Sequence, residues 1–568
     1  MTVRSRRLDM EPAAAAKRKR DESVDGRPPS LRDESATEIG RPLSHEQFNC
    51  PLEFVNRYME TLDILHPNLL NQEALRLKHG GKMYSPLAAQ PPGTGKTTLG
   101  AHLTSVLRRP RESPKLEKEV SRCLKNAWAW RGMTRSAQET IEAAMKDTRD
   151  ECLVMRVLRV CFPHHGGTLE RLRESEPVVV AMKALPRPDA QLGFDAALGL
   201  LIFAHAKGLD IDRTSTHEAF AAAAPLRSST GAVKALIDER GPLLFVLDDI
   251  TDLQQPEYAA YFSSVSRATP LHRAMTQLNQ SLQRLHGVEN CFIYCTGRSL
   301  WLAMKALKVP TSPLHVFPLM LAPLTARDVR ETLKKTPGHD SARYLKHEIC
   351  VAQSVRLHLC RQAVRVTGGM GRMLQYLLRA LQQAAGERLR AETEADVDAA
   401  IEQARLRVSS DLELRITWDG PADDAADVPV LLQGESTKRQ LLRLFARALL
   451  LDAPFSPDLE IRLGHDTKVC FSDAAVVLGF SYMPVATLPG TVSDHNSDDD
   501  TVADGESGSA IVGTGAGFLA VSPPSPQPER LKLVAGEWLC RSLATDPRIA
   551  ADPALLVTAQ RCAILAAR

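Results

Sequence analysis

The chain has 568 residues, of which 44% are hydrophobic and 24% are charged. This is the ordinary globular mixture, and the length predicts about three or four domains at roughly 150 residues each. The 33 glycines and 36 prolines exclude a collagen-like or wholly low-complexity chain. The 71 Lys and Arg residues balance 68 Asp and Glu residues, and a net charge of +3 gives no case for a general polyanion binder.

The cysteines and the apolar runs indicate the redox environment of the protein and whether it could cross a membrane. The 11 cysteines include no C-x-x-C pair, which favours a reduced, intracellular environment over a disulfide framework. The basic start of the chain has no apolar stretch of signal-peptide length. The longest apolar run, residues 196–204, is too short to span a bilayer. We therefore expect a soluble protein with no membrane partner.

Two segments have charge without apolar periodicity. Residues 1–45 are predicted to be a disordered basic tail, and residues 486–529 a disordered acidic linker rich in Ser and Pro. The basic cluster from Lys17 to Arg20 predicts nuclear import, or weak, salt-sensitive affinity for nucleic acid. The alternative is a run of solvated tail charges.

Between these segments the apolar pattern alternates between strands and helices. The predicted strands are 83–90, 177–185, 241–249 and 291–296, with a further apolar run at 314–321; the predicted helices include segments within 46–80 and 111–150, together with 195–208 and 270–286. This alternation predicts an α/β domain over residues 46–320, with a parallel sheet wrapped by helices.

The remaining residues predict smaller units. Residues 321–408 are helical in pattern throughout and are interpreted as a helical lid domain. Residues 409–485 are expected to form a small C-terminal domain of short mixed elements. Residues 530–568 are expected to form two short C-terminal helices.

The strongest chemical signal is QPPGTGKTT, residues 90–98, between a strand and a helix. A glycine-rich loop there turns backbone N–H groups toward one anion. The residues expected around the phosphates of a nucleotide are Pro92, Gly93, Thr94, Gly95, Lys96, Thr97 and Thr98. Lys96 would reach the β- and γ-phosphates, and the Thr97 hydroxyl would hold Mg²⁺. Gln90 departs from the pattern G-x-x-x-x-G-K-[ST], which has glycine at this position, and is expected to cost some loop geometry.

The second signal is LLFVLDDITD, residues 243–252, a buried strand that ends in acids. A carboxylate held at the carboxyl edge of a sheet suits magnesium. Asp248 is the predicted metal ligand, through water, and Asp249 is predicted to orient the attacking water. The alternative is two acids that only begin a turn.

Two further segments carry candidate nucleotide contacts. In CFIYCTGRS, residues 291–299, Thr296 at the strand tip could hold the water, and Arg298 could sense the γ-phosphate. In TGGMGRMLQYLL, residues 367–378, Arg372 could close the lid over the nucleotide. An exposed turn and a capped helix with a solvated arginine are the respective alternatives.

A zinc site is rejected. Cys152, Cys161, His164 and His165 have the residue types for zinc, but they form no paired ligand clusters. We interpret them as structural cysteines and surface histidines.

The order of QPPGTGKTT, LLFVLDD, CTGR, LAPLTARDV (residues 321–329) and TGGMGR resembles P-loop ATPases of the AAA+/STAND superclass. Within it, FIYCTGRSLWLAM (292–304) is similar to the ATPase domain of Crinkler-type and retrotransposon-hot-spot proteins. The resemblance covers residues 82–405 and implies ATP rather than GTP, Mg²⁺, and assembly into homo-oligomers. Aspartate at position 249, as in signalling STAND ATPases, implies slow hydrolysis or a switch. The long gap between Lys96 and Asp248 implies an insertion near residues 110–175, and the Crinkler translocation motif does not occur.

The sequence therefore predicts an ATP-binding P-loop protein that hydrolyses ATP slowly with Mg²⁺. Closure of the lid, through Arg298 or Arg372 on the γ-phosphate, would control contacts with other proteins made by the lid or the C-terminal region. The first alternative is a nucleotide-gated interaction protein that does not hydrolyse ATP. The second is a nuclear ATPase of Crinkler or hot-spot type that acts on DNA or chromatin.

Overall fold

The computed structural model describes most of the chain between residues 57 and 409 and short pieces beyond. The described residues are 57–78, 82–90, 94–146, 149–186, 193–208, 228–254, 258, 261, 270–297, 314–335, 349–351, 355–384, 389–391, 393–409, 441, 444–445, 448, 454–456, 459–463, 467–471, 481–484, 531–534, 553, 557 and 560. The predicted basic tail, the import signal at Lys17–Arg20 and the predicted linker at 486–529 lie outside them.

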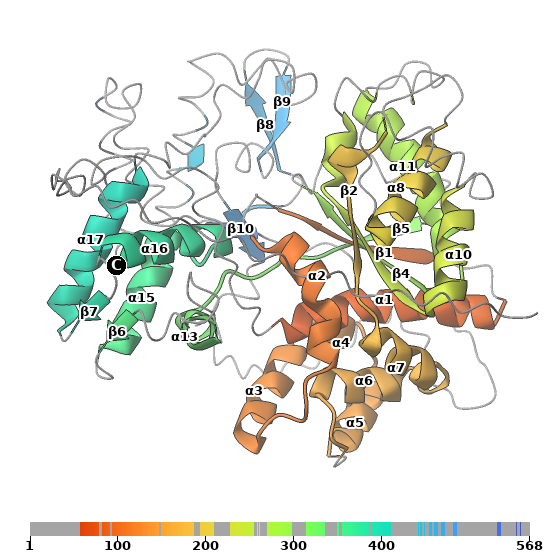
Figure 1. Ribbon diagram of the computed structural model, residues 1–568, viewed down its shortest axis with the longest axis horizontal. Helices are drawn as coiled ribbons and strands as arrows, with labels where there is room; N and C mark the ends of the chain where they lie inside the picture. Colours follow the sequence, from red (N-terminus) through yellow and green to blue (C-terminus); the bar gives the residue numbers. More distant parts are fainter. Residues whose placement is uncertain are drawn as a thin grey trace, which may run out of the picture. The chain divides into compact units, whose positions relative to one another are not determined.

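The core is a parallel five-stranded sheet in the order β2-β3-β4-β1-β5. The strands are β1 (Met83–Ala89), β2 (Val178–Ala181), β3 (Leu243–Asp248), β4 (Cys291–Gly297) and β5 (Leu314–Pro318). Strand β4 therefore lies between β1 and β3, and all five strands end at the same edge. The predicted α/β class, with a parallel sheet flanked by helices, is confirmed (Figure 1).

Both faces of the sheet are apolar, as a parallel sheet covered on two sides requires. On β3, Phe245 and Leu247 belong to one buried cluster, whereas Leu244 and Val246 belong to another. Helices α8 (Phe194–Lys207), α10 (Ser229–Arg240) and α11 (Pro270–His286) cover the first face. Helices α1 (Tyr58–Arg76) and α2 (Lys96–Leu107) cover the second. The predicted helix 195–208 ends as expected at Gly208, which has a left-handed φ of 64°.

Helix α1 contributes hydrogen bonds to the sheet as well as apolar contacts. Strands β1 and β4 pair only at their carboxyl ends, from Leu87 onward. Below that point Asn68 bonds both the N–H and the carbonyl of Ile293 at 2.8 and 2.9 Å, and Asn71 bonds both groups of Tyr84 at 2.8 Å. Gln72 accepts from the Asn290 N–H at 2.7 Å. The three amides lie three and four positions apart, on one side of a helix, and supply β-like partners to strand backbone.

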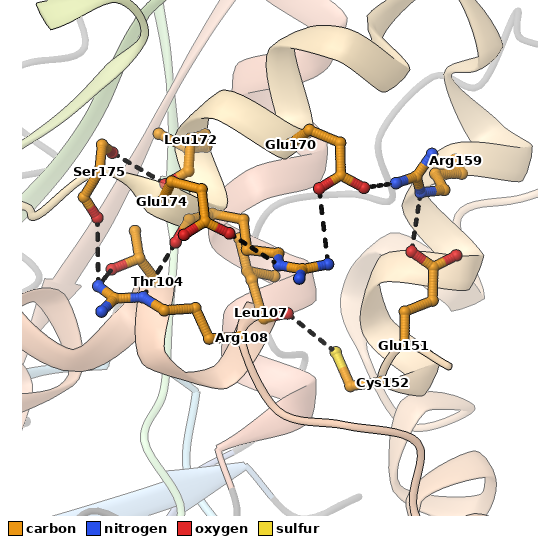
Figure 2. Close-up of polar contacts among 11 residues, drawn as sticks. Thr104, Leu107, Arg108, Glu151, Cys152, Arg159, Glu170, Leu172, Glu174 and Ser175 are labelled. Atoms are coloured by element: carbon orange, nitrogen blue, oxygen red, sulfur yellow. Dashed lines mark hydrogen bonds and ion pairs between the residues drawn. The ribbon is translucent and has the colours of Figure 1, made fainter. Parts of the chain in front are cut away.

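The insertion between α2 and β2 is helical. It contains α3 (Pro114–Leu124), α4 (Trp128–Arg131), α5 (Arg135–Ala144), α6 (Leu153–Cys161) and α7 (Gly166–Glu174), with a 3₁₀ turn over Pro163–His165. Figure 2 shows how it is tied to the end of α2. Arg108 donates to the carbonyls of Arg173 and Ser175 at 3.0 and 3.3 Å, so its positive charge lies at the carboxyl end of α7.

The same view shows the guanidinium group of Arg159 on α6 paired with the Glu170 carboxylate on α7. Arg159 also pairs with Glu151 at 2.9 Å (Figure 2). Within α7, Arg173 pairs with Glu170 at 3.5 Å. The carboxyl end of α2 is therefore anchored on a charged part of the insertion, at the carboxyl end of α7.

A helical module follows β5. It comprises α13 (Ala326–Lys335), α15 (Arg356–Thr367), α16 (Gly371–Ala384) and α17 (Glu394–Ser409), which share a buried cluster of their own. The prediction of helix throughout this region is wrong in one respect, because β6 (Ile349–Val351) and β7 (Leu389–Ala391) form a short parallel pair. Gly369 has a φ of 70°, and a side chain there would meet the Leu324 carbonyl at 2.5 Å.

Beyond residue 409 the described pieces are mainly strands. Strand β8 (Glu460–Leu463) pairs with β9 (Thr467–Cys470), and β10 (Ser481–Pro484) pairs with β11 (Leu531–Val534), both antiparallel. The expectation of two helices over 530–568 is thus wrong at its start, since 531–534 is a strand supported by β10. Among the described residues, no helix combines the length and apolarity that a membrane span requires.

Candidate phosphate and magnesium site

The candidate site lies where β1 passes into α2. Gly95 caps the helix with a φ of 93°, a conformation that glycine adopts without steric cost. Lys96, the first helical residue, is 9% exposed, and its Nζ donates to the carbonyl of Gln90 at 2.7 Å. The lysine side chain therefore folds back onto the residue that follows β1, and its charge lies at the N-terminus of α2.

The next residue connects this loop to the acid strand. The Thr97 hydroxyl donates to Oδ1 of Asp248 at 2.5 Å. Thr296, at the end of the intervening strand β4, donates to the same oxygen at 2.7 Å. One carboxylate oxygen thus receives two hydroxyls from two different elements, which fixes its position at the carboxyl edge of the sheet.

Asp249 has an unusual backbone. Its φ is 56°, which is uncommon for a residue other than glycine and is held here by hydrogen bonds. The Asp249 N–H donates to the Thr296 hydroxyl at 2.9 Å, and its carboxylate accepts from the Thr251 hydroxyl at 2.5 Å. Thr296 therefore positions both acids, a role that was not predicted; its expected role of holding a water near the γ-phosphate stays a prediction. Thr251 was not predicted.

Gln90 makes side-chain contacts that the sequence did not indicate. Its side chain is fully buried, accepts from the Leu321 N–H at 2.8 Å and donates to the Leu321 carbonyl at 3.2 Å. The Gln90 side chain thus makes two hydrogen bonds to backbone beyond β5, while its expected cost to loop geometry concerns residues 91–93, which lie outside the described residues. The signal that could have revealed this role is a polar residue at the end of an otherwise apolar strand.

Two residues that were not singled out place α2 against the sheet. A side chain at Gly100 would come within 2.7 Å of Val246 and 3.0 Å of Tyr294, so only glycine permits this approach. The Tyr294 hydroxyl donates to the Lys96 carbonyl at 3.4 Å. Burial raises the pKa of Tyr294 well above its ordinary value, so the phenol remains neutral.

The other predicted site residues are distributed as follows. Thr94 is half-buried in the loop, and Thr98 is exposed on the first turn of α2. Arg372 is exposed in the first turn of α16 in the helical module. Pro92, Gly93 and Arg298 lie outside the described residues.

The rejected zinc ligands have other partners. His165 is buried 2.9 Å from the Glu73 carboxylate, so its interpretation as a surface histidine is wrong, whereas His164 is exposed. Burial raises the pKa of Cys161 to about 12. Within the part of the chain that the structure describes, no group of three or more His, Cys, Asp or Glu side chains could hold a metal. A single hydroxyl and a single carboxylate, as at Thr97 and Asp248, fit Mg²⁺ bound together with phosphate oxygens and water.

No protein-family model matches this chain, and no curated protein matches it significantly. Among solved structures, it is similar to the Aeropyrum pernix ORC2 protein in ADPNP–ADP complexes. The TM-score is 0.30 and the sequence identity 15%, over 74% of this chain and 81% of that one. Similarity at this level identifies no family. The fold itself defines the class. It is an α/β domain with a parallel sheet, in which a glycine-capped helix begins at the carboxyl ends of the strands.

Proposed function

We propose that this protein binds ATP with Mg²⁺ at the edge formed by β1, β4 and β3, and hydrolyses it slowly. The observation that carries the proposal is the contact between Thr97 and Asp248. A hydroxyl after the loop lysine and a carboxylate at the end of a buried strand are the two protein groups that P-loop enzymes place on magnesium. Their meeting supports the resemblance to AAA+/STAND ATPases.

Each residue would have a defined task. Bound ATP would supply the phosphoryl group, and Mg²⁺ would neutralise the negative charge on the phosphate oxygens. Lys96 and the N-terminus of α2 would add positive charge at the phosphates. Asp248, directly or through water, and Thr97 would hold the metal. Asp249 would orient a water molecule for in-line attack and accept its proton, with Thr296 fixing the Asp249 backbone.

The proposed consequence of turnover is a change in the helical module and in the partner surfaces it presents. This step rests on the presence of a separate buried cluster in that module, joined to the core by residues 319–324. Homo-oligomers, other protein partners, nuclear import and kinship with Crinkler and hot-spot proteins stay predictions.

A second candidate is a nucleotide-gated interaction protein without turnover. It is favoured by the Thr251–Asp249 hydrogen bond, which occupies one oxygen of the carboxylate that would serve the water. In this case ATP would act as a structural ligand whose presence alone determines the state of the module.

The deciding measurement is phosphate release from ATP and Mg²⁺ under multiple-turnover conditions. We compare the wild type with Lys96→Ala and Asp249→Asn, and with Asp238→Asn, an exposed acid on α10, as the matched control. Turnover that is lost in the first two variants and retained in the control supports an ATPase. Thermal stabilisation by ATP without turnover, abolished by Lys96→Ala, supports the second candidate. Absence of both effects in the wild type would refute nucleotide binding.

A further inference from the structure

The chain between β5 and the helical module is held to the core at consecutive points. We call residues 319–324 the connector. The Leu319 N–H donates to the Leu87 carbonyl at 2.8 Å, and the Ala322 carbonyl accepts from Arg57 at 2.8 Å. Between them, the backbone of Leu321 is bonded on both sides by the Gln90 side chain. The next hydrogen bond, from the Leu324 N–H to the Gly369 carbonyl at 2.8 Å, already belongs to the helical module.

The backbone of Gln90 adjoins the candidate site, whereas its side chain lies outside that site. Its carbonyl accepts from Lys96 at 2.7 Å, and its N–H donates to the carbonyl of Gly297, the last residue of β4, at 3.2 Å. One fully buried residue therefore bonds the loop lysine, the strand that carries Thr296, and the connector.

We propose that Gln90 is a positioning residue that transmits nucleotide occupancy from Lys96 to the helical module. The inference rests on the proposed function, because the signal begins when phosphate oxygens compete with the Gln90 carbonyl for the Lys96 ammonium. Any shift of the Gln90 backbone is passed on through its side chain, whose amide oxygen and nitrogen are held by the N–H and the carbonyl of one residue, Leu321.

The departure from the loop pattern is essential to this inference. The pattern has glycine where this chain has Gln90, and glycine has no side chain that could reach Leu321. The connector would then be coupled to the loop only through strand packing. Gln90 adds a direct hydrogen-bonded route between two sites, with the differential contact that a population shift requires.

The test compares nucleotide binding with the response of the connector. Binding of ADP and of a slowly hydrolysed ATP analogue is measured by calorimetry. Hydrogen–deuterium exchange is then followed in peptides covering residues 314–335, with and without each nucleotide. We expect a nucleotide-dependent change in exchange in the wild type. Gln90→Leu, which keeps the side chain's bulk but removes both hydrogen bonds, should still bind nucleotide and lose that change.

Gln72→Leu is the matched control. Gln72 is also a buried amide that bonds strand and loop backbone, at Asn290, Val288 and Cys291, but at the opposite end of β4. This variant should lose comparable hydrogen bonds and still show the nucleotide-dependent change in the connector. If it loses the change as well, general loosening of the fold explains the effect and the inference is wrong.

The remaining outcomes are also decisive. Gln90→Gly restores the loop pattern and serves if Gln90→Leu does not fold; it too should bind nucleotide without a connector response. If either Gln90 variant shows the same nucleotide-dependent exchange change as the wild type, the inference is wrong. If the Gln90 variants lose nucleotide binding, the inference is also wrong, because Gln90 would then only shape the loop. A wild type that binds nucleotide without any connector response overturns the inference alone, whereas a wild type that binds no nucleotide refutes the proposed function.

Discussion

The Thr97 hydroxyl lies 2.5 Å from Oδ1 of Asp248, although 151 positions separate the two residues in the chain. The parallel sheet explains the meeting. Strands β1 and β3 flank β4 and end at the same level, so the residue after the loop lysine and the last residue of β3 converge over Thr296. The pair can form only if the helical insertion between α2 and β2 folds without displacing the carboxyl ends of β1, β3 and β4.

Asp248→Asn should weaken nucleotide binding only when Mg²⁺ is present. The amide oxygen can still accept from Thr97 and Thr296, so the fold is retained, but the charge that attracts the metal is lost. For a group that acts on the metal through water, we expect a loss of about 10–100-fold in affinity. Calorimetric titrations in Mg²⁺ and in EDTA measure it, and equal losses in both would show that Asp248 serves the loop and not the metal.

Thr296→Val should cost about 1–3 kcal/mol in the free energy of unfolding, because it leaves the Asp249 N–H without its hydroxyl partner in nearly the same side-chain volume. Thr296 is 1% exposed, so water does not replace the lost group. Thr296→Ser should recover most of the loss. Urea denaturation measures both variants, and a serine variant as unstable as valine would assign the effect to packing.

Gly100→Ala should destabilise the protein by about 1–3 kcal/mol, since the new methyl group collides with buried Val246 on β3. The same collision pushes α2 away from the sheet, and nucleotide affinity should fall with stability. Gly167→Ala in α7 is the control, because a side chain there meets nothing within 4 Å. It should be neutral or stabilising by up to about 1 kcal/mol. Thermal unfolding measures both variants: the melting temperature should fall for Gly100→Ala and should stay unchanged or rise for Gly167→Ala.

Stability should decline as the pH falls below about 6.5. Burial lowers the pKa of His66 from 6.5 to about 4 and that of His286 to about 3. A depressed pKa means that the unfolded chain takes up the proton first, so the stabilisation is complete above pH 6.5 and is lost progressively toward pH 4. Urea denaturation between pH 4.5 and 7.5 measures this slope.

His66→Phe should flatten part of that slope, because it keeps the edge-on ring contact with Phe162 and removes the titrating group. His164→Phe, on an exposed residue nearby, should leave the slope unchanged. The pKa of Glu73 is lowered below 4.5, chiefly by its hydrogen bond with Arg76, so that carboxylate contributes mainly at more acidic pH. Identical slopes in His66→Phe and the wild type would remove His66 from the explanation.

The sequence predicted much of the core because its signals are local. A glycine-rich loop after an apolar strand, and acids at the end of another, depend on neighbours in the chain, and these elements lie where they were expected. The roles of Gln90 and Thr251 depend on partners whose placement requires the folded chain. The short strands β6 and β11 were missed for the same reason: three or four residues form a strand only when a partner from another segment lies beside them.

Helix α1 has a consequence for the smallest part of this protein that can be produced alone. A fragment that began at Met83, the start of the first strand, would retain every sheet strand and all the described site residues. It would lack Asn68, Asn71 and Gln72, and the backbone of Tyr84 and Ile293 would be left without partners inside the sheet. Unpaired strand backbone of this kind recruits other chains and promotes aggregation. The autonomous unit must therefore begin before Tyr58, well upstream of the residues that would bind the nucleotide.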